Sequence, residues 1–144
     1  QSYGGVDGDS ASMAEFCAVV SAFSKQPNRQ DIAITGSMNQ FGESQPIGGV
    51  NEKIEGFYDV CEIKGRHAGQ GVIIPRSNVH NLMLRPDIVK AVEKGDFQIW
   101  AIDHVTEAVE LFTGKAAGEA TDEGTYPIDT IFGLAQAKLN ALRK

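Results

Sequence analysis

The first strongly patterned segment of the chain predicts an amphipathic helix over residues 11–25. Ser10 or Ser12 is placed to cap its start, and Pro27 lies just beyond its end. The apolar positions recur every three or four residues, which aligns them along one helical stripe. These positions are Met13, Phe16, Cys17, Val20 and Phe23. A helix is therefore expected directly behind the opening segment GVDGDS.

Three segments have the pattern of strands. Residues 31–38, DIAITGSM, predict a strand that turns at NQFGES and returns through residues 44–49, so we expect a hairpin. The run GVIIP at 71–75 is apolar throughout, which is typical of a central strand covered on both faces. FQIWAID at 97–103 predicts a further strand.

Further helices alternate with these strands. Residues 50–64 follow the pair Gly48-Gly49, and Gly65 is the expected C-cap. Their buried stripe consists of Val50, Ile54, Phe57, Tyr58 and Cys61. Residues 86–94 predict a short helix that opens with a proline, and residues 105–114 predict another that a glycine closes.

The alternation predicts an α/β or α+β fold in which a mixed β-sheet packs with helices, and we commit to the α+β class. We expect one domain over residues 1–114, a small and polar linker over 115–127, and a C-terminal amphipathic helix over 128–144. One face of that helix carries Ile128, Ile131, Phe132, Ala135, Leu139 and Leu142. This apolar face must pack on its own domain or on a neighbouring molecule.

Composition and charge exclude several classes of function. The chain has 144 residues, enough for one domain, and a net charge of −6 with no basic stripe, which argues against nucleic-acid binding. No apolar run reaches the length of about 20 residues that a membrane span needs, and no signal peptide opens the chain. Cys17 and Cys61 lie in helical patterns without metal or redox spacing, so we interpret them as buried thiols of a reducing compartment.

The segment GVDGDSASMAE at residues 5–15 suggests either a calcium loop or a serine at a helix start. A calcium loop counted from Asp7 fails, because Ser12 stands where the motif requires glycine and Ala18 where it requires glutamate. No P-loop motif occurs in the chain. The three histidines at 67, 80 and 104 lie in separate segments, so their spacing supports neither a metal site nor a serine triad.

The remaining chemistry is a serine with a lysine base. Ser10 follows the Gly8 turn at a helix start, where backbone N–H groups and the helix dipole stabilise an oxyanion. A lysine acts as a base only when its amine is neutral, which partial burial favours. Lys53 is the best candidate because it flanks the apolar stripe of its helix, so we expect its stem beside the core. A surface serine and a surface lysine are the alternative interpretation.

Three motifs in order resemble the proteolytic domain of the Lon protease family. They are DGDSASMAEFCAVVSA, DIAITGSMNQFGESQPIGGVNEKIEG and GVIIPRSNVHNL, and the resemblance runs from about residue 5 to 114. The Gly-x-Ser-Ala turn of the family matches Ser10, and its Gly-Gly-x-x-Glu/Ala-Lys segment matches Lys53. The threonine of its Thr-Gly pair matches Thr35, and Asp9 before the serine is similar to the B-type branch.

The resemblance implies a ribosomal protein S5 domain 2-like fold and a cytoplasmic, ATP-dependent serine peptidase that forms a hexameric ring. Its substrates are expected to be unfolded polypeptides. ATP and magnesium are expected only for an ATPase module, which this chain does not contain. The strands that precede the nucleophile in the family are also absent, and the chain starts without Met, which suggests a piece of a longer polypeptide.

The mechanism expected from the resemblance is attack by Ser10 on the scissile carbonyl while Lys53 takes its proton and Thr35 orients the amine. Asp9 admits two interpretations. It either caps the helix or pairs with Lys53 and keeps the amine charged, which would make the isolated domain weakly active. Two other classes stay open: a catalytically idle module that acts in ring assembly or partner docking, and a kinase-like phosphate-binding domain.

Overall fold

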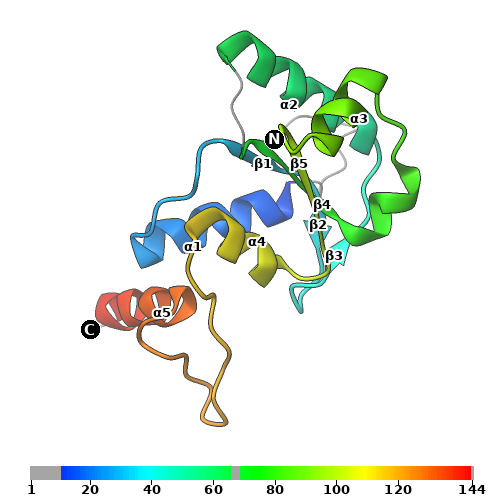
Figure 1. The fold of residues 1–144 in the computed structure, drawn as a ribbon. Helices are drawn as coiled ribbons and strands as arrows, with labels where there is room; N and C mark the ends of the chain where they lie inside the picture. Colours follow the sequence, from blue (N-terminus) through cyan, green and yellow to red (C-terminus); the bar gives the residue numbers. More distant parts are fainter. Residues whose placement is uncertain (1–10, 66–68, 144) are drawn as a thin grey trace, which may run out of the picture.

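The computed structural model describes residues 11–65 and 69–143, and its centre is a three-stranded parallel sheet (Figure 1). The strand order is β1 (Ile32–Ile34), β4 (Gly71–Pro75), β5 (Gln98–Ile102). The predicted GVIIP strand is confirmed as the central one, and all five of its residues are buried. Parallel neighbours need crossover connections, which the intervening helices supply.

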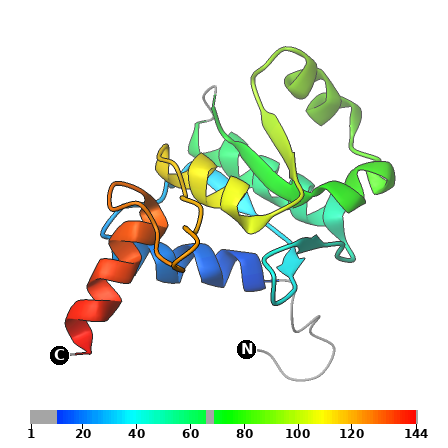
Figure 2. The same cartoon turned by 90° about the horizontal axis from the view of Figure 1, so that it is seen from below.

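Helices cover both faces of this sheet (Figures 1 and 2). One face carries α1 (Ser12–Ser24) and α4 (Val105–Thr113), and the other carries α2 (Val50–Lys64) and α3 (Pro86–Glu93). The helix that the sequence predicts over 50–64 is confirmed as α2, with the same bounds. Its C-cap is Gly65, whose φ of 83° is favourable only for glycine. The predicted α+β class, with helices packed on a sheet, is confirmed.

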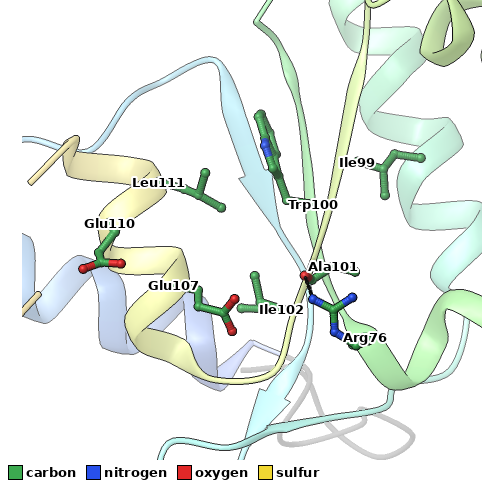
Figure 3. Close-up of a pocket in the computed structure, with 8 residues that line it drawn as sticks. All are labelled: Arg76, Ile99, Trp100, Ala101, Ile102, Glu107, Glu110 and Leu111. Atoms are coloured by element: carbon green, nitrogen blue, oxygen red, sulfur yellow. Dashed lines mark hydrogen bonds between the residues drawn. The ribbon is translucent and has the colours of Figure 1, made fainter. Parts of the chain in front are cut away.

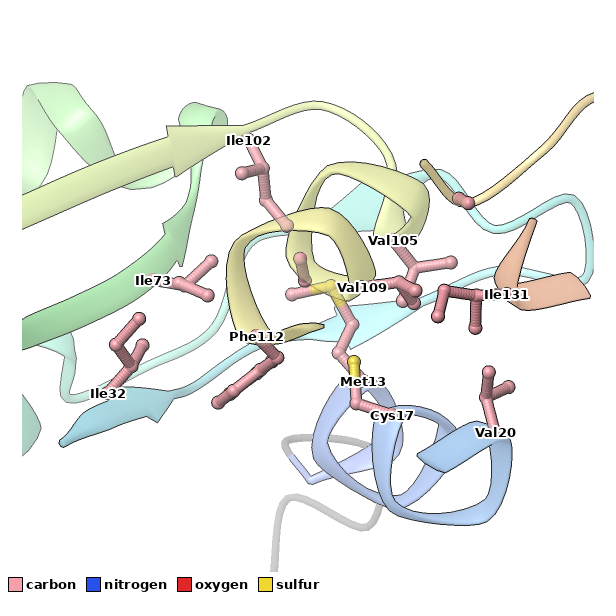
Figure 4. Close-up of a cluster of buried hydrophobic side chains, with 12 residues drawn as sticks. Met13, Cys17, Val20, Ile32, Ile73, Ile102, Val105, Val109, Phe112 and Ile131 are labelled. Carbon is pink, nitrogen blue, oxygen red and sulfur yellow. The ribbon is translucent and has the colours of Figure 1, made fainter. Parts of the chain in front are cut away.

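The sheet separates two cores. Figure 4 shows the core on the α1 and α4 side, in which Met13, Cys17, Val109 and Ile131 pack in one cluster. The second core lies under α2 and α3 and contains Val50, Ile54, Tyr58, Cys61, Val72, Ile74, Ile88, Ala91 and Phe97. The two cysteines are buried as predicted, and they belong to different cores.

The predicted hairpin forms, but it is separate from the main sheet. Antiparallel β2 (Ser37–Met38) and β3 (Ser44–Gln45) pair with each other, so parallel and antiparallel pairs occupy two sheets rather than one. The prediction of a single strand over 31–38 is wrong, because the strand is interrupted at Gly36, which has a φ of 138°. An L side chain rarely adopts that conformation.

The C-terminal helix α5 (Ile131–Leu142) packs on α1 (Figure 2). It begins three residues later than sequence predicted, where Thr130 caps it by accepting the N–H of Gly133 at 3.1 Å. Ile131 is fully buried, whereas Ile128 is 80% exposed. The predicted apolar face is therefore buried only in its first half, since Leu139 and Leu142 are also exposed.

Two local features differ from the sequence predictions. The N-cap of α1 is Ala11, which makes no side-chain cap, and the Ser12 hydroxyl instead accepts the N–H of Met38 at 3.0 Å. A 3₁₀ helix, η1 (Arg76–Asn81), was not predicted and directly follows β4. Within the described residues, no helix combines the length and apolar composition that crossing a membrane requires.

Candidate active site

The start of α1 is attached to the segment that leaves β1. The N–H of Met13 donates to the carbonyl oxygen of Gly36 at 3.4 Å, and the N–H of Met38 donates to the Ser12 hydroxyl at 3.0 Å. A Cβ on Gly36 would overlap the side chains of Met13 and Pro75, so the three elements meet in van der Waals contact here. The first turn of α1 is therefore fixed beside the carboxyl ends of β1 and β4.

Three predicted site residues, Gly8, Asp9 and Ser10, lie outside the described residues. Ser10 nevertheless directly precedes Ala11, the N-cap of α1, and Ser12 makes the contact with Met38.

Thr35 lies at the end of β1 in the same junction. Its N–H donates to the carbonyl oxygen of Ile73 at 3.0 Å, so the β1–β4 ladder continues one residue beyond β1. Ile32 and Ile34 pack in the core on the α1 side and Ala33 in the core on the α2 side. Because side chains alternate along a strand, the Thr35 side chain belongs to the α2 side. Only 9% of the residue is exposed.

Lys53 lies in the first turn of α2, where its N–H donates to the carbonyl oxygen of Gly49 at 3.1 Å. Its neighbours Val50 and Ile54 are buried against the sheet, on the face to which Thr35 belongs. The predicted burial of the Lys53 stem is wrong, because the residue is exposed. The structure brings Thr35 and Lys53 to one side of the sheet, but among the described residues no hydrogen bond joins them.

Two open hollows lie elsewhere, along β5. Figure 3 shows the first, of about 520 Å³, between Trp100 and Ile102 of β5 and Glu107, Glu110 and Leu111 of α4. The second, of about 500 Å³, is more apolar and lies between β5 and α3. Neither is lined by Thr35 or Lys53, so these hollows are separate from the candidate dyad.

The histidines and cysteines have structural surroundings. His104 caps α4, because its Nδ1 accepts the N–H of Thr106 at 3.2 Å while its Nε2 lies 2.7 Å from the carbonyl oxygen of Phe41. His80 is an exposed residue of η1, and His67 lies outside the described residues. Burial raises the pKa of the Cys17 thiol to about 12, which disfavours a thiolate nucleophile. In the described part of the chain, no three His, Cys, Asp or Glu side chains group as metal ligands.

A buried asparagine at the junction escaped the sequence analysis. Asn78 is 1% exposed and its amide holds the backbone of Ile47, just before α2. The sequence signal was weak, because one asparagine after an apolar strand is also typical of a turn. Arg85 was missed as well. It pairs with Asp59 of α2 and Asp87 of α3, and these hydrogen bonds lower the pKa of both carboxyl groups.

Comparison with known proteins agrees with this arrangement. Residues 4–113 match the family model of the Lon protease (S16) C-terminal proteolytic domain. A Lon protease homolog of Escherichia coli (strain K12) is 59% identical over 111 residues, covering 77% of this chain and 19% of the relative. A homolog from Haemophilus influenzae is 42% identical over 139 residues, covering 96% of this chain and 23% of the relative.

An archaeal Lon protease of Thermococcus kodakarensis is 41% identical over 111 residues, covering 77% of this chain and 16% of the relative. The chain thus spans about a fifth of the length of these relatives. The family match covers well over half of the chain and includes the junction of α1, β1 and α2. The chain therefore belongs to the Lon protease C-terminal proteolytic domain family.

Proposed function

We propose that this chain is a serine peptidase unit in which Ser10 and Lys53 form a catalytic dyad. The observation that carries the proposal is the attachment of the first turn of α1 to Gly36 and Met38, next to Thr35. Ser10 directly precedes Ala11 in the sequence, and α2 carries Lys53 on the side of the sheet to which Thr35 belongs. Family membership supports the same assignment.

In the proposed reaction, the Ser10 hydroxyl attacks the scissile carbonyl while the neutral Lys53 amine accepts its proton. Lys53 then gives the proton to the leaving amine as the peptide C–N bond breaks. Water next attacks the carbonyl carbon of the Ser10 ester while Lys53 accepts its proton, and Lys53 returns this proton to the Ser10 oxygen as the ester bond breaks. The Thr35 hydroxyl orients the lysine amine. Backbone N–H groups around Ser10, at the start of α1, stabilise the oxyanion.

The exposure of Lys53 bears on where the enzyme is active. A neutral amine is favoured by a shielded environment, so we infer that the active form covers Lys53 in an assembled ring. A hexameric, cytoplasmic, ATP-dependent protease that receives unfolded polypeptides fits this requirement. ATP and magnesium would then act in an ATPase module outside this chain. The isolated chain is expected to be slow, and more so if Asp9 pairs with Lys53.

Hydrolysis of a short unstructured peptide tests the proposal, because such a substrate needs no unfolding. We expect Ser10→Ala to abolish hydrolysis and Lys53→Met to slow it on the order of 100-fold or more, since general bases contribute that much. Ser77→Ala and Lys64→Met are matched controls at exposed positions, and both should keep the wild-type rate. Hydrolysis that survives Ser10→Ala, or none in the wild-type chain, overturns the dyad.

The exposure of Lys53 also favours a second candidate, an idle protease-like module that acts in ring assembly or partner docking. This module would assemble without Ser10-dependent hydrolysis. Sedimentation velocity of wild-type and Ser10→Ala chains separates the two. Equal assembly combined with no hydrolysis in either chain supports the idle module, whereas hydrolysis by the wild type alone supports the enzyme.

A further inference from the structure

Asn78 is a buried polar side chain that has no direct role in the proposed dyad. It lies in η1, three residues after the end of β4, and only 1% of it is exposed. Its Oδ1 accepts the N–H of Ile47 at 3.0 Å, and its Nδ2 donates to the carbonyl oxygen of the same residue at 3.0 Å. A third hydrogen bond joins Nδ2 to Oδ1 of Asn81 at 3.1 Å.

This pairing uses both ends of the Asn78 amide. The Ile47 backbone presents one donor and one acceptor, and the amide offers an acceptor oxygen and a donor nitrogen side by side. An aspartate at this position keeps an acceptor for the N–H but loses the donor for the carbonyl oxygen. Because the group is buried, each lost partner leaves a polar atom without water to replace it.

The segment held by Asn78 leads directly into the helix of Lys53. Ile47 precedes Gly49, which adopts a φ of 71° as the N-cap of α2 and accepts the Lys53 N–H at 3.1 Å. A second asparagine holds the first turn of α2 itself, because Asn51 donates to the carbonyl oxygen of Asn81 at 2.9 Å. It also accepts the N–H of Met83 at 2.7 Å. The side-chain amides of Asn78 and Asn51 therefore tie the start of α2 to η1 and to the segment after it.

The strand before Asn78 also contacts the segment after β1 and the start of α1. Asn78 follows β4, and Ile73 of β4 accepts the N–H of Thr35 at 3.0 Å. Pro75, the last residue of β4, packs together with Met13 of α1 against Gly36. Asn78 thus links the start of α2 to the strand end against which the start of α1 is packed.

We propose that Asn78 is a positioning residue that sets the location of the Lys53 amine relative to Ser10. The inference rests on the proposed dyad. Asn78 contacts backbone in the interior rather than any reacting group, so it acts through the first turn of α2. When its amide is lost, the turn that carries Lys53 shifts, and proton transfer slows while substrate binding is kept.

The test measures kcat and KM for the unstructured peptide in wild-type, Asn78→Asp and Asn140→Asp chains. Asn140 is an exposed residue of α5, so its variant matches the change in charge without the buried contact. We expect Asn78→Asp to lower kcat on the order of 10-fold to 100-fold with KM unchanged, because displacement of about 1 Å has effects of this size. Asn140→Asp should match the wild type.

A double-mutant cycle separates positioning from a general loss of fold. In the Lys53→Met background, Asn78→Asp should cause no further decrease in the residual rate, because its effect passes through the missing amine. A purely structural effect would lower that residual rate by the same factor as in the wild type. Circular dichroism melting identifies the temperature at which every variant is folded for the assay.

Asn51→Ala provides a second variant if Asn78→Asp does not fold. It removes the other attachment of α2 and should also lower kcat in a Lys53-dependent manner. Unchanged kcat in the variant that folds, or an equal loss in the Lys53→Met background, overturns the inference and leaves the dyad intact. A wild-type chain without Ser10-dependent hydrolysis overturns both.

Discussion

Cys17 is a single side chain whose chemistry is set by its surroundings. It is 3% exposed in the core between α1 and α4, and burial raises the pKa of its thiol from 9.0 to about 12. The unfolded chain loses this proton near pH 9.0, whereas the folded chain holds it until about pH 12. The free energy of unfolding should therefore fall as the pH rises above 9.0 through this window.

Two measurements check this prediction in a Cys61→Ala background, in which Cys17 is the remaining thiol. Reaction with Ellman's reagent at pH 8 should follow the rate of global unfolding, because the folded thiol is buried and protonated. The alkaline loss of stability should decrease in a further Cys17→Ala variant. Rapid labelling of the native chain at pH 8 would contradict the assigned burial.

At the scale of elements, Gly71 shows how closely the two parallel strands approach. A Cβ at this position would overlap the backbone of Gln98 on β5, and backbone cannot move aside without breaking the ladder. Gly56 provides a control, since a Cβ there meets nothing within 4 Å and the residue lies inside α2. The same substitution should therefore have opposite signs at the two positions.

Gly71→Ala is expected to destabilise the chain by about 1–3 kcal/mol, the usual cost of overpacking. Gly56→Ala should stabilise it by about 0.5–1 kcal/mol, because alanine is the better helix former. Chemical denaturation of both variants gives the two free energies. A Gly71→Ala chain as stable as the wild type would mean that β4 and β5 are not paired in this register.

Local patterns predicted most of these elements. The helix α2 and the strand β4 were predictable because a helical stripe and an apolar run closed by proline are signals within one segment. The break at Gly36 was not, because its cause is contact with Met13 and Pro75, which are distant in sequence. The 3₁₀ helix η1 was missed for a similar reason, since its buried residue Asn78 is held by Ile47.

At the scale of the whole molecule, α5 extends the core beyond the sheet and its four covering helices. Ile131 at its start is fully buried among residues of α1 and α4, whereas Ile128 just before it is 80% exposed. Phe132 adds an edge-to-face contact with Phe16 of α1, with ring centroids 6.1 Å apart. The helix is therefore an integral part of the folded unit in this structure.

Ile131→Ala should destabilise the chain by about 2–5 kcal/mol, because it opens a cavity in the core. Ile128→Ala removes the same atoms from an exposed position and should change the free energy of unfolding by less than about 0.5 kcal/mol. Thermal and urea unfolding of the pair measures the difference. Equal stability of the two variants would show that α5 does not dock as described.

The sequence motifs identified the candidate dyad more readily than its environment. Ser10, Thr35 and Lys53 were chosen from short segments, and the structure places the described members of this set on one side of the sheet. The exposure of Lys53 could not be predicted, because it depends on which distant segments cover the start of α2. A helical stripe fixes which residues of α2 face the sheet and leaves its other faces undetermined.

The most direct test of the central claim is to map the adduct of a fluorophosphonate serine probe by peptide mass spectrometry in wild-type and Lys53→Met chains. We predict modification of Ser10 alone, at a rate that falls on the order of 100-fold or more in Lys53→Met and is unchanged in the Lys64→Met control. Modification of another serine, or of Ser10 at equal rates with and without Lys53, would contradict the dyad.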